Sequence, residues 1–337
     1  MVKAVKVRKR NAEKVRKFLA KAKMINFDYL PASSKDFIFF PISEDKSARL
    51  NQLVGSGDIS GIVSKKLESQ RREKVSLPPF DIIGEVAIFE LPKEYKDAID
   101  SKKEKAAKEM GDKILAHHKN IKTAAFKTGG IKGPFRIRSF KIVSGKKSAL
   151  TMHKEMGCRF MIDVSKAYYS PRLSFERKRI NSIAKDGENV FVLFAGVGPF
   201  ALIIAKNHPN STVYANELNP EAYKHLKENI KLNKLSNVVP IPGDARKLAK
   251  TYKGTADRIV MPLPMSADEF LDVAFALARK NCMVHFYYFT SSIEKAEEKV
   301  LLAAKKARRK AKIVLSRRVR DYAPDILEAV VDFKVLN

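Results

Sequence analysis

The chain of 337 residues contains no tryptophan, only two cysteines and no long uninterrupted hydrophobic run. Cys158 and Cys282 lie far apart and form no C-x-x-C or Cys/His pattern, which argues against a disulfide framework and a structural zinc site. We therefore expect no metal and a reducing, cytoplasmic setting. The longest apolar stretch, 190–205, is interrupted by two glycines and a proline, so we expect no membrane span. No apolar segment follows the basic start, MVKAVKVRKR, and we expect no secretion signal.

Acidic residues are also scarce. The 66 Lys and Arg residues outnumber 37 Asp and Glu residues, which leaves a net charge of +29. Residues 1–30 carry ten basic side chains, and residues 301–320 carry nine without any acid. Because no membrane segment is expected, this surplus predicts an extended nucleic-acid partner. The alternative is a lysine-rich surface of the thermophilic kind, but the acids that would pair with these lysines are missing locally.

The length of the chain and its apolar share of 45% indicate two or three folded domains. We predict a small N-terminal α/β domain at 1–66 and a charged linker at 67–79. A middle α+β domain at 80–166 is expected to form one sheet with a covering helix near 106–117. Inside it, the glycines at 129, 130 and 133 predict a long loop before the next strand.

The last section, 167–337, alternates apolar runs with helical stretches. This order predicts an α/β fold with a mostly parallel, doubly wound sheet of the Rossmann type. The strand candidates are 190–194, 213–216, 238–241, 258–261, 283–289, 313–315 and 327–335.

A glycine-rich turn follows the first of these strands, over Phe194-Ala195-Gly196-Val197-Gly198-Pro199-Phe200. Glycines at this place let the backbone approach a ligand closely. The pattern also fits a dinucleotide site, but Pro199 removes an N–H group that a pyrophosphate would use. A ligand without phosphate, such as S-adenosylmethionine, loses less binding when this N–H group is absent.

Acidic and amide side chains follow the next two strands. Glu217 lies 21 residues after Gly196, the spacing at which such folds place a carboxylate on ribose hydroxyls. Asn219 precedes a proline and is expected to cap a helix. Asp244, which precedes Ala245, could accept from an adenine amino group or cap a helix, and the sequence leaves both roles open.

The pattern as a whole resembles the archaeal and eukaryotic tRNA (guanine-37, N1)-methyltransferases. The resemblance covers nearly the whole chain and includes LPPFDIIG at 77–84, FRIR at 135–138, HKEMG at 153–157, YSPRL at 169–173, ERKRI at 176–180 and FAGVGPF at 194–200. It implies S-adenosylmethionine as cofactor, the anticodon loop of tRNA as partner and two small RNA-binding domains before a Rossmann-like methyltransferase domain. The cofactor-contacting residues it predicts are Phe194, Gly196, Gly198, Phe200, Glu217, Asn219, Asp244, Ala245 and Pro262.

The resemblance also implies two catalytic residues. Arg136 matches the arginine that stabilises charge on guanine O6, and Glu176 matches the carboxylate that takes the proton from N1. A positioned base and a guanidinium at the oxyanion both favour attack by N1 on a methyl group. From the residues alone, Glu176 could instead pair with Arg179 or Arg172, and Arg136 could contact phosphate.

Two departures from the family pattern stand out. No acid precedes the glycine turn, because Val192-Leu193-Phe194 occupies its place, and Pro262 replaces an asparagine in the loop at the target base. A proline there resembles the archaeal branch that also methylates C7 of 4-demethylwyosine in tRNAPhe, so we predict both activities and include Pro262 among the catalytic residues. An aminocarboxypropyl transferase and a non-catalytic tRNA-binding protein are the alternatives, with a dehydrogenase more distant. Nothing in the sequence requires a dimer, so we expect a monomer.

Overall fold

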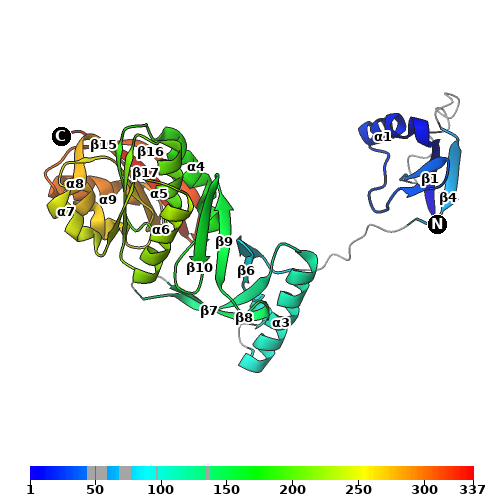
Figure 1. Ribbon diagram of the computed structural model, residues 1–337, viewed down its shortest axis with the longest axis horizontal. Coiled ribbons are helices and arrows are strands. Elements are labelled where there is room, and N and C mark those ends of the chain that lie inside the picture. The colour runs from blue at the N-terminus through cyan, green and yellow to red at the C-terminus, as the bar shows by residue number, and fades with distance from the viewer. Residues whose placement is uncertain (44–49, 51–58, 68–76, 96–97, 134, 136) are drawn as a thin grey trace. The chain divides into compact units, whose positions relative to one another are not determined.

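The computed structural model describes residues 1–43, 50, 59–67, 77–95, 98–133, 135 and 137–337. The chain divides into two compact units, Met1–Ser76 and Leu77–Asn337 (Figure 1). Most of the predicted linker, 67–79, lies outside the described residues. The domain boundaries at 66, 79 and 166 therefore stay predictions.

The first unit is a four-stranded sheet with one helix. Alternating apolar residues of the central strand bury one face of the sheet, where Val5 pairs with Phe40 on one side and Ile62 on the other. The helix buries Val15 and Leu19, four residues apart, in the same core. The strands lie in the order β2-β3-β1-β4 in the sheet. Along the chain, the elements are β1 (Val2–Arg8), α1 (Ala12–Lys21), β2 (Ala32–Ser33), β3 (Phe37–Pro41) and β4 (Gly61–Lys65).

The second unit begins with a four-stranded sheet in the order β5-β6-β7-β8, covered by one helix as predicted (Figure 1). Its elements are β5 (Phe80–Ile83), β6 (Val86–Phe89), α3 (Asp100–His117), β7 (Thr123–Lys132) and β8 (Ile137–Gly145). The predicted loop at 129–133 is wrong for residues 129–132, which belong to β7. Strand β7 continues through Gly129 and Gly130, and the pairing with β8 shifts register between Lys127 and Ile131. These glycines lie at an irregularity in the strand pairing, a position where glycine is common in sheets.

The next hairpin, β9 (Leu150–Glu155) and β10 (Cys158–Asp163), forms a sheet of its own, whereas the sequence placed it in the middle sheet. Phe160 and Ile162 of β10 are fully buried, in the same core as residues of the large C-terminal sheet. The hairpin thus joins the middle sheet to the last part of the chain.

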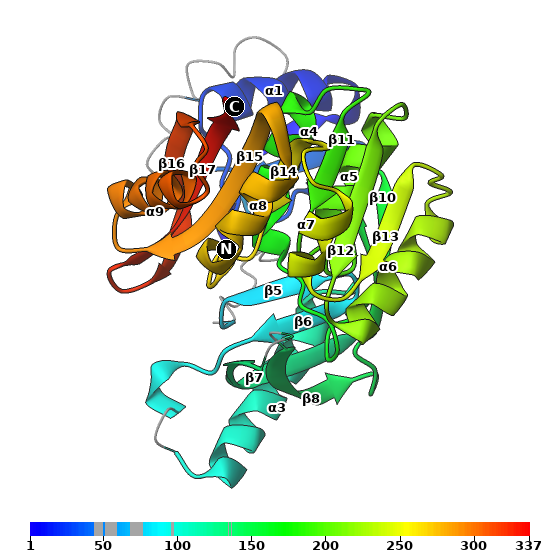
Figure 2. The same ribbon diagram turned by 90° about the vertical axis from the view of Figure 1, so that its left-hand side faces the viewer.

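The remaining chain forms a seven-stranded sheet in the order β13-β12-β11-β14-β15-β17-β16, parallel from β13 to β15 and antiparallel at β17 and β16 (Figure 2). This confirms the predicted doubly wound α/β class. The strands are β11 (Asn189–Val192), β12 (Thr212–Glu217), β13 (Val238–Pro242), β14 (Ala256–Met261), β15 (Ala278–Thr290), β16 (Ala311–Ala323) and β17 (Ile326–Val335). The helices are α4 (Ser174–Ile183), α5 (Pro199–Asn207), α6 (Pro220–Leu232), α7 (Leu248–Thr251), α8 (Leu271–Leu277) and α9 (Ile293–Lys306).

Strand β16 is much longer than the predicted 313–315. Its arginines hide the strand pattern in the sequence, since an edge strand carries charged side chains without loss of pairing. The basic cluster of 301–320 therefore lies on the end of α9 and along this edge strand. In the described part of the chain, none of the helices is both long enough and apolar enough to span a bilayer.

Candidate active site

The carboxyl ends of β11, β12, β13 and β14 meet at one edge of the large sheet, beside a cavity of about 710 Å³. Parallel α/β sheets bind their ligands at this edge. Eight of the nine predicted cofactor residues line the cavity, and Gly198 is the one that does not. The eight are Phe194, Gly196, Phe200, Glu217, Asn219, Asp244, Ala245 and Pro262.

The glycine turn between β11 and α5 has an unusual backbone. Gly196 has φ 58° and Gly198 has φ 94°, in the left-handed region that favours glycine, and Phe194 adopts φ 59° as well. A Cβ atom on Gly198 would lie 2.5 Å from Leu202 Cδ1 and 2.6 Å from Leu226 Cδ1, so Gly198 is needed for packing. A Cβ atom on Gly196 would meet only the Tyr168 carbonyl oxygen, at 3.6 Å. The space in front of Gly196 is therefore open to a ligand.

Glu217 connects this turn to the next strand end. Its Oε2 accepts a hydrogen bond from Gly196 N and its Oε1 accepts one from Asn219 N, both at 2.7 Å. Glu217 is 9% exposed, and burial raises the pKa of its carboxyl group above the ordinary value. A carboxylate has about four acceptor sites, so Glu217 can also accept from a hydroxyl group of a ligand. We call Gly196, Glu217 and Asn219 the cradle.

Both predicted helix caps are present. Asn219 Oδ1 accepts from Glu221 N at 3.0 Å and caps α6, while its Nδ2 donates to the Lys166 carbonyl oxygen at 2.7 Å. Asp244 Oδ1 accepts from Arg246 N at 2.9 Å and caps the turn that follows β13. The capping role left open for Asp244 is thus confirmed, and its contact with adenine stays a prediction.

A stiff apolar wall closes the other side of the cavity. Pro262, Leu263 and Pro264 line it, and Phe289 N donates to the Pro264 carbonyl oxygen at 2.7 Å. The Phe289 ring stacks on Tyr322 of β16, with ring centroids 3.9 Å apart. This wall offers stacking surface, and the side chain of Pro262 has no hydrogen-bonding group.

The two predicted catalytic residues are not both described. Arg136 lies outside the described residues, although Gly133 and Phe135 beside it line the cavity. Glu176 lies in the first turn of α4 and is 1% exposed; it is not among the residues that line the cavity, whereas Arg172 and Leu173 are. The structure therefore does not bring the Glu176 carboxylate to the cavity surface.

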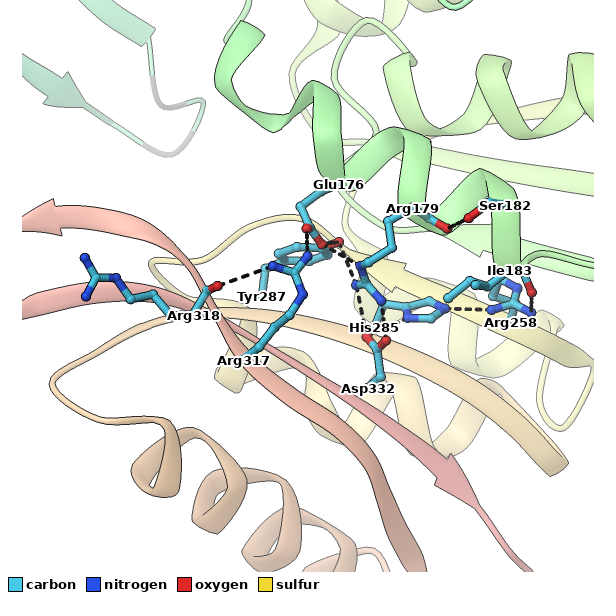
Figure 3. Close-up of polar contacts among 10 residues, drawn as sticks. All are labelled: Glu176, Arg179, Ser182, Ile183, Arg258, His285, Tyr287, Arg317, Arg318 and Asp332. Carbon is cyan, nitrogen blue, oxygen red and sulfur yellow. Dashed lines mark hydrogen bonds and ion pairs between the residues drawn. The ribbon is translucent and has the colours of Figure 1, made fainter.

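Three donors surround the Glu176 carboxylate (Figure 3). Its Oε2 accepts from the Tyr287 hydroxyl at 2.7 Å and from Arg179 Nε at 3.0 Å, and its Oε1 accepts from Arg317. The ion pair with Arg179 that the sequence allowed is present. Arg172 is instead paired with Asp81 at 2.7 Å.

A chain of buried charges continues beyond Arg179 (Figure 3). Arg179 also pairs with Asp332, whose Oδ1 lies 2.7 Å from His285 Nδ1. Arg258 Nη1 lies 2.7 Å from His285 Nε2. Because a guanidinium can only donate, Nε2 must accept, so the ring proton is on Nδ1 and His285 is neutral. Burial lowers the pKa of His285. Burial alone would raise the pKa of Asp332, but hydrogen bonds and charge interactions with His285 and Arg179 lower it to about 2.

We call this set the Glu176 network. It comprises Glu176, Arg179, Arg258, His285, Tyr287, Arg317 and Asp332. Sequence reasoning missed it and interpreted 283–289 only as a strand. A usable signal was present, since His285 and Asp332 are polar residues inside otherwise apolar strands and pair directly across β15 and β17.

A second buried pair explains two motifs of the sequence. Arg177 donates from Nε and Nη2 to the two oxygens of Glu155, each at 2.7 Å, and its side chain is 1% exposed. The arginine comes from α4 and the glutamate from β9. The motifs at 153–157 and 176–180 therefore meet in space and fix the hairpin to the helix that carries Glu176.

Comparison with known proteins agrees with this geometry. Residues 151–314 match the family described as the TRM5/TYW2 methyltransferase domain, and residues 4–48 match the tRNA methyltransferase 5 N-terminal domain. The chain is 36% identical over 353 residues to a tRNA (guanine(37)-N(1))-methyltransferase, Trm5b, of Pyrococcus abyssi, with 99% of each chain covered. The chain belongs to the TRM5/TYW2 methyltransferase family. The cofactor of this family is S-adenosylmethionine, as predicted.

Two further relatives bear on the function. A solved complex of aTrm5 with tRNALeu has a TM-score of 0.75 and 27% identity, and covers 99% of both chains. A protein of Nanoarchaeum equitans named tRNA (guanine(37)-N(1))/4-demethylwyosine(37)-methyltransferase Taw22 is 32% identical, over 66% of this chain and 86% of the relative. The family match therefore extends over the whole chain.

Proposed function

We propose that this protein is an S-adenosylmethionine-dependent tRNA methyltransferase that forms N1-methylguanosine at position 37. The observation that carries the proposal is the cradle, in which Glu217 fixes both the glycine turn and the start of α6 at the edge of the cavity. The similarity to Trm5b along the entire chain supports the choice of substrate.

The residues of the cradle fit the cofactor. The open space at Gly196, the fixed carboxylate of Glu217 and the apolar side chains of Phe194 and Phe200 suit a nucleoside with ribose hydroxyls. Asp244 lines the cavity, and we propose that it accepts from an adenine amino group in addition to its contact with Arg246. When bound, S-adenosylmethionine supplies an electrophilic methyl group.

Glu176 is proposed to accept the proton from guanine N1. For this, Glu176 Oε1 must become accessible from the cavity, because the carboxylate is buried and three donors already contact its two oxygens. Arg317 is the partner best placed to move: its side chain is 29% exposed, whereas that of Arg179 is 14% exposed and Tyr287 is fully buried. We propose that the RNA backbone draws Arg317 away and so frees Glu176 Oε1.

Arg136 is proposed to stabilise the negative charge that develops on guanine O6. A guanidinium placed at a developing oxyanion acts most strongly in a site that excludes water. In support, the neighbouring residues Gly133 and Phe135 line the cavity.

The decisive experiment identifies the product nucleoside. A defined tRNA transcript with guanine at position 37 is incubated with methyl-labelled or carboxyl-labelled S-adenosylmethionine, and the nucleosides are analysed by mass spectrometry. Methyl label in N1-methylguanosine is expected. Carboxyl label in the RNA would instead indicate an aminocarboxypropyl transferase. Tight tRNA binding without cofactor binding in calorimetry would indicate a non-catalytic protein.

We further propose that the protein methylates C7 of 4-demethylwyosine in tRNAPhe, and that it acts as a monomer. Pro262 supports the second activity, because it lines the cavity and leaves an apolar wall where a tricyclic base could stack. The Nanoarchaeum relative is named for both reactions. The test supplies tRNAPhe that carries 4-demethylwyosine; unlabelled tricyclic base would refute the second activity. Light scattering tests the monomer.

A further inference from the structure

Strand β17 contains a carboxylate that neither the cradle nor the Glu176 network uses. Glu328 is fully buried, and its Oε2 accepts from Arg320 Nε of β16 at 2.6 Å. Its Oε1 has no hydrogen-bond partner within the described residues. Burial raises the pKa of Glu328, so its environment is costly for a charge. Such a buried group calls for an explanation beyond stability.

The register places this pair directly at the cavity wall. Glu328 of β17 lies between Phe289 of β15 and Arg320 of β16. Residues directly opposite in neighbouring strands share a face of the sheet. Phe289 and Arg320 both line the cavity, whereas Glu328 between them is fully buried and does not line it.

Arg320 differs from the other basic side chains that line the cavity. Lys127, Arg172 and Arg246 pair with Glu90, Asp81 and Asp244, and these acids line the cavity themselves. Arg177 is buried and its donors are occupied by Glu155, Tyr169 and Ser170. For Arg320, in contrast, the paired acid is fully buried and does not line the cavity.

The geometry of the pair orients a fork of donors. Glu328 holds Nε, and neither Nη group of Arg320 donates a hydrogen bond to any residue that the structure describes. The side chain is 21% exposed. The adjacent carboxylate of Asp321 is engaged by Arg318. A guanidinium held in this way matches two phosphate oxygens.

We propose that Arg320 binds the 5′ phosphate of the target nucleotide and that Glu328 is the positioning residue that holds its guanidinium. The proposal rests on the proposed function, because it requires a nucleotide whose base enters the cavity while its phosphate stays at the rim. Arg320 then fixes the nucleotide on the side opposite the cradle.

The first test removes the fork. Arg320→Gln is expected to weaken binding of a full-length tRNA transcript by about 10- to 100-fold. It should also lower the slope of log Kd against log salt concentration by about 0.7, the value for one contact with a single strand. Arg159→Gln is the matched control, since it removes an exposed arginine that does not line the cavity and lies outside both basic clusters. Thermal melts establish that both variants are folded.

The second test identifies the phosphate. A transcript with an uncharged methylphosphonate linkage on the 5′ side of residue 37 should bind wild-type protein as weakly as Arg320→Gln binds normal RNA. The same linkage should cost the Arg320→Gln variant nothing further. If the linkage and Arg320→Gln weakened binding independently, so that their fold losses of affinity multiplied, the proposal would be overturned. A salt slope that Arg320→Gln leaves unchanged would also overturn it. If Arg320→Gln does not fold, Arg320→Lys replaces it, because it keeps the charge without the fork.

The third test concerns Glu328. Glu328→Gln still offers an oxygen to Arg320 Nε, whereas Glu328→Leu does not. Tight tRNA binding should survive the first change and fall with the second, while calorimetric binding of S-adenosylmethionine stays unchanged in both. Equal tRNA affinity of the two variants would contradict a positioning role. Wild-type protein that transfers no methyl group to tRNA would refute the proposed function, whereas the binding tests judge Arg320 separately.

Discussion

The cradle and the Glu176 network lie in the same sheet but are built in different ways. The cradle uses residues at the ends of adjacent parallel strands, and its polar contacts are largely with backbone N–H groups. The network uses side chains from α4, β14, β15, β16 and β17, and its contacts join charged side chains to one another. The difference teaches that a binding site made from local motifs is visible in the sequence, whereas a charge network assembled from distant elements is not.

The largest expected effect separates chemistry from binding. Glu176→Gln should lower the single-turnover rate of N1 methylation by about 10²–10⁴-fold, because the amide cannot accept the proton. Affinities for tRNA and cofactor should change little, as measured by filter binding and calorimetry. The control is Glu221→Gln, which alters a half-exposed glutamate on α6. Turnover that survives Glu176→Gln would assign the proton to another group and leave Glu176 a structural member of the network.

The next prediction compares the network with a surface pair. Asp332→Ala leaves Arg179 buried without its main partner and should lower the free energy of unfolding by about 3–5 kcal/mol. Asp321→Ala, which removes the partner of exposed Arg318, should cost at most about 1 kcal/mol. Urea unfolding measures both. Similar losses for the two variants would mean that the network does not behave as a buried unit.

The glycine turn that holds Gly196 of the cradle can be disturbed through Gly198. Gly198→Ala places a methyl group against Leu202 and Leu226 and should cost about 1–3 kcal/mol of unfolding free energy beyond the cost of its positive φ. Gly187→Ala provides the matched control, because Gly187 has φ 83° and no atom within 4 Å of an added Cβ. Calorimetry should show weakened cofactor binding for Gly198→Ala alone. Equal behaviour of the two variants would remove the packing argument for the turn.

The smallest expected effect is a pH dependence. Because the pKa of His285 is lowered by burial in the fold, the unfolded chain takes up a proton near pH 6.5 that the folded chain does not. The free energy of unfolding should therefore fall as pH decreases from 7 to 5, by up to about 1.4 kcal/mol per pH unit from this group. Asp332 does not contribute in this range, since its pKa of about 2 and its ordinary value both lie below it. His285→Gln should flatten the dependence in urea titrations, and parallel curves for wild type and variant would contradict the assignment.

Particular residues show why prediction succeeded and where it stopped. Glu217 and the glycine turn were found because the spacing of a βαβ unit determines which residues meet at the strand ends. Strand β16 was underestimated because its arginines conceal the periodicity of an edge strand. Arg320 was noticed only as part of a basic cluster, since its role depends on pairing with Glu328, eight residues away across a hairpin. For Glu176, the sequence allowed two interpretations, a catalytic base and an ion pair, and the structure contains the ion pair with Arg179.

The order of apolar runs and turn residues determined the doubly wound sheet, the glycine turn and the acid that holds it, because these follow from interactions between residues close in sequence. Only the tertiary structure decided that Glu176 is enclosed by Arg179, Arg317 and Tyr287, and that Arg320 presents its cation to the cavity. The physical reason is that the pairing of buried charges depends on which strands are neighbours and on their register. A one-residue slip between β16 and β17 would turn these side chains to the opposite face of the sheet.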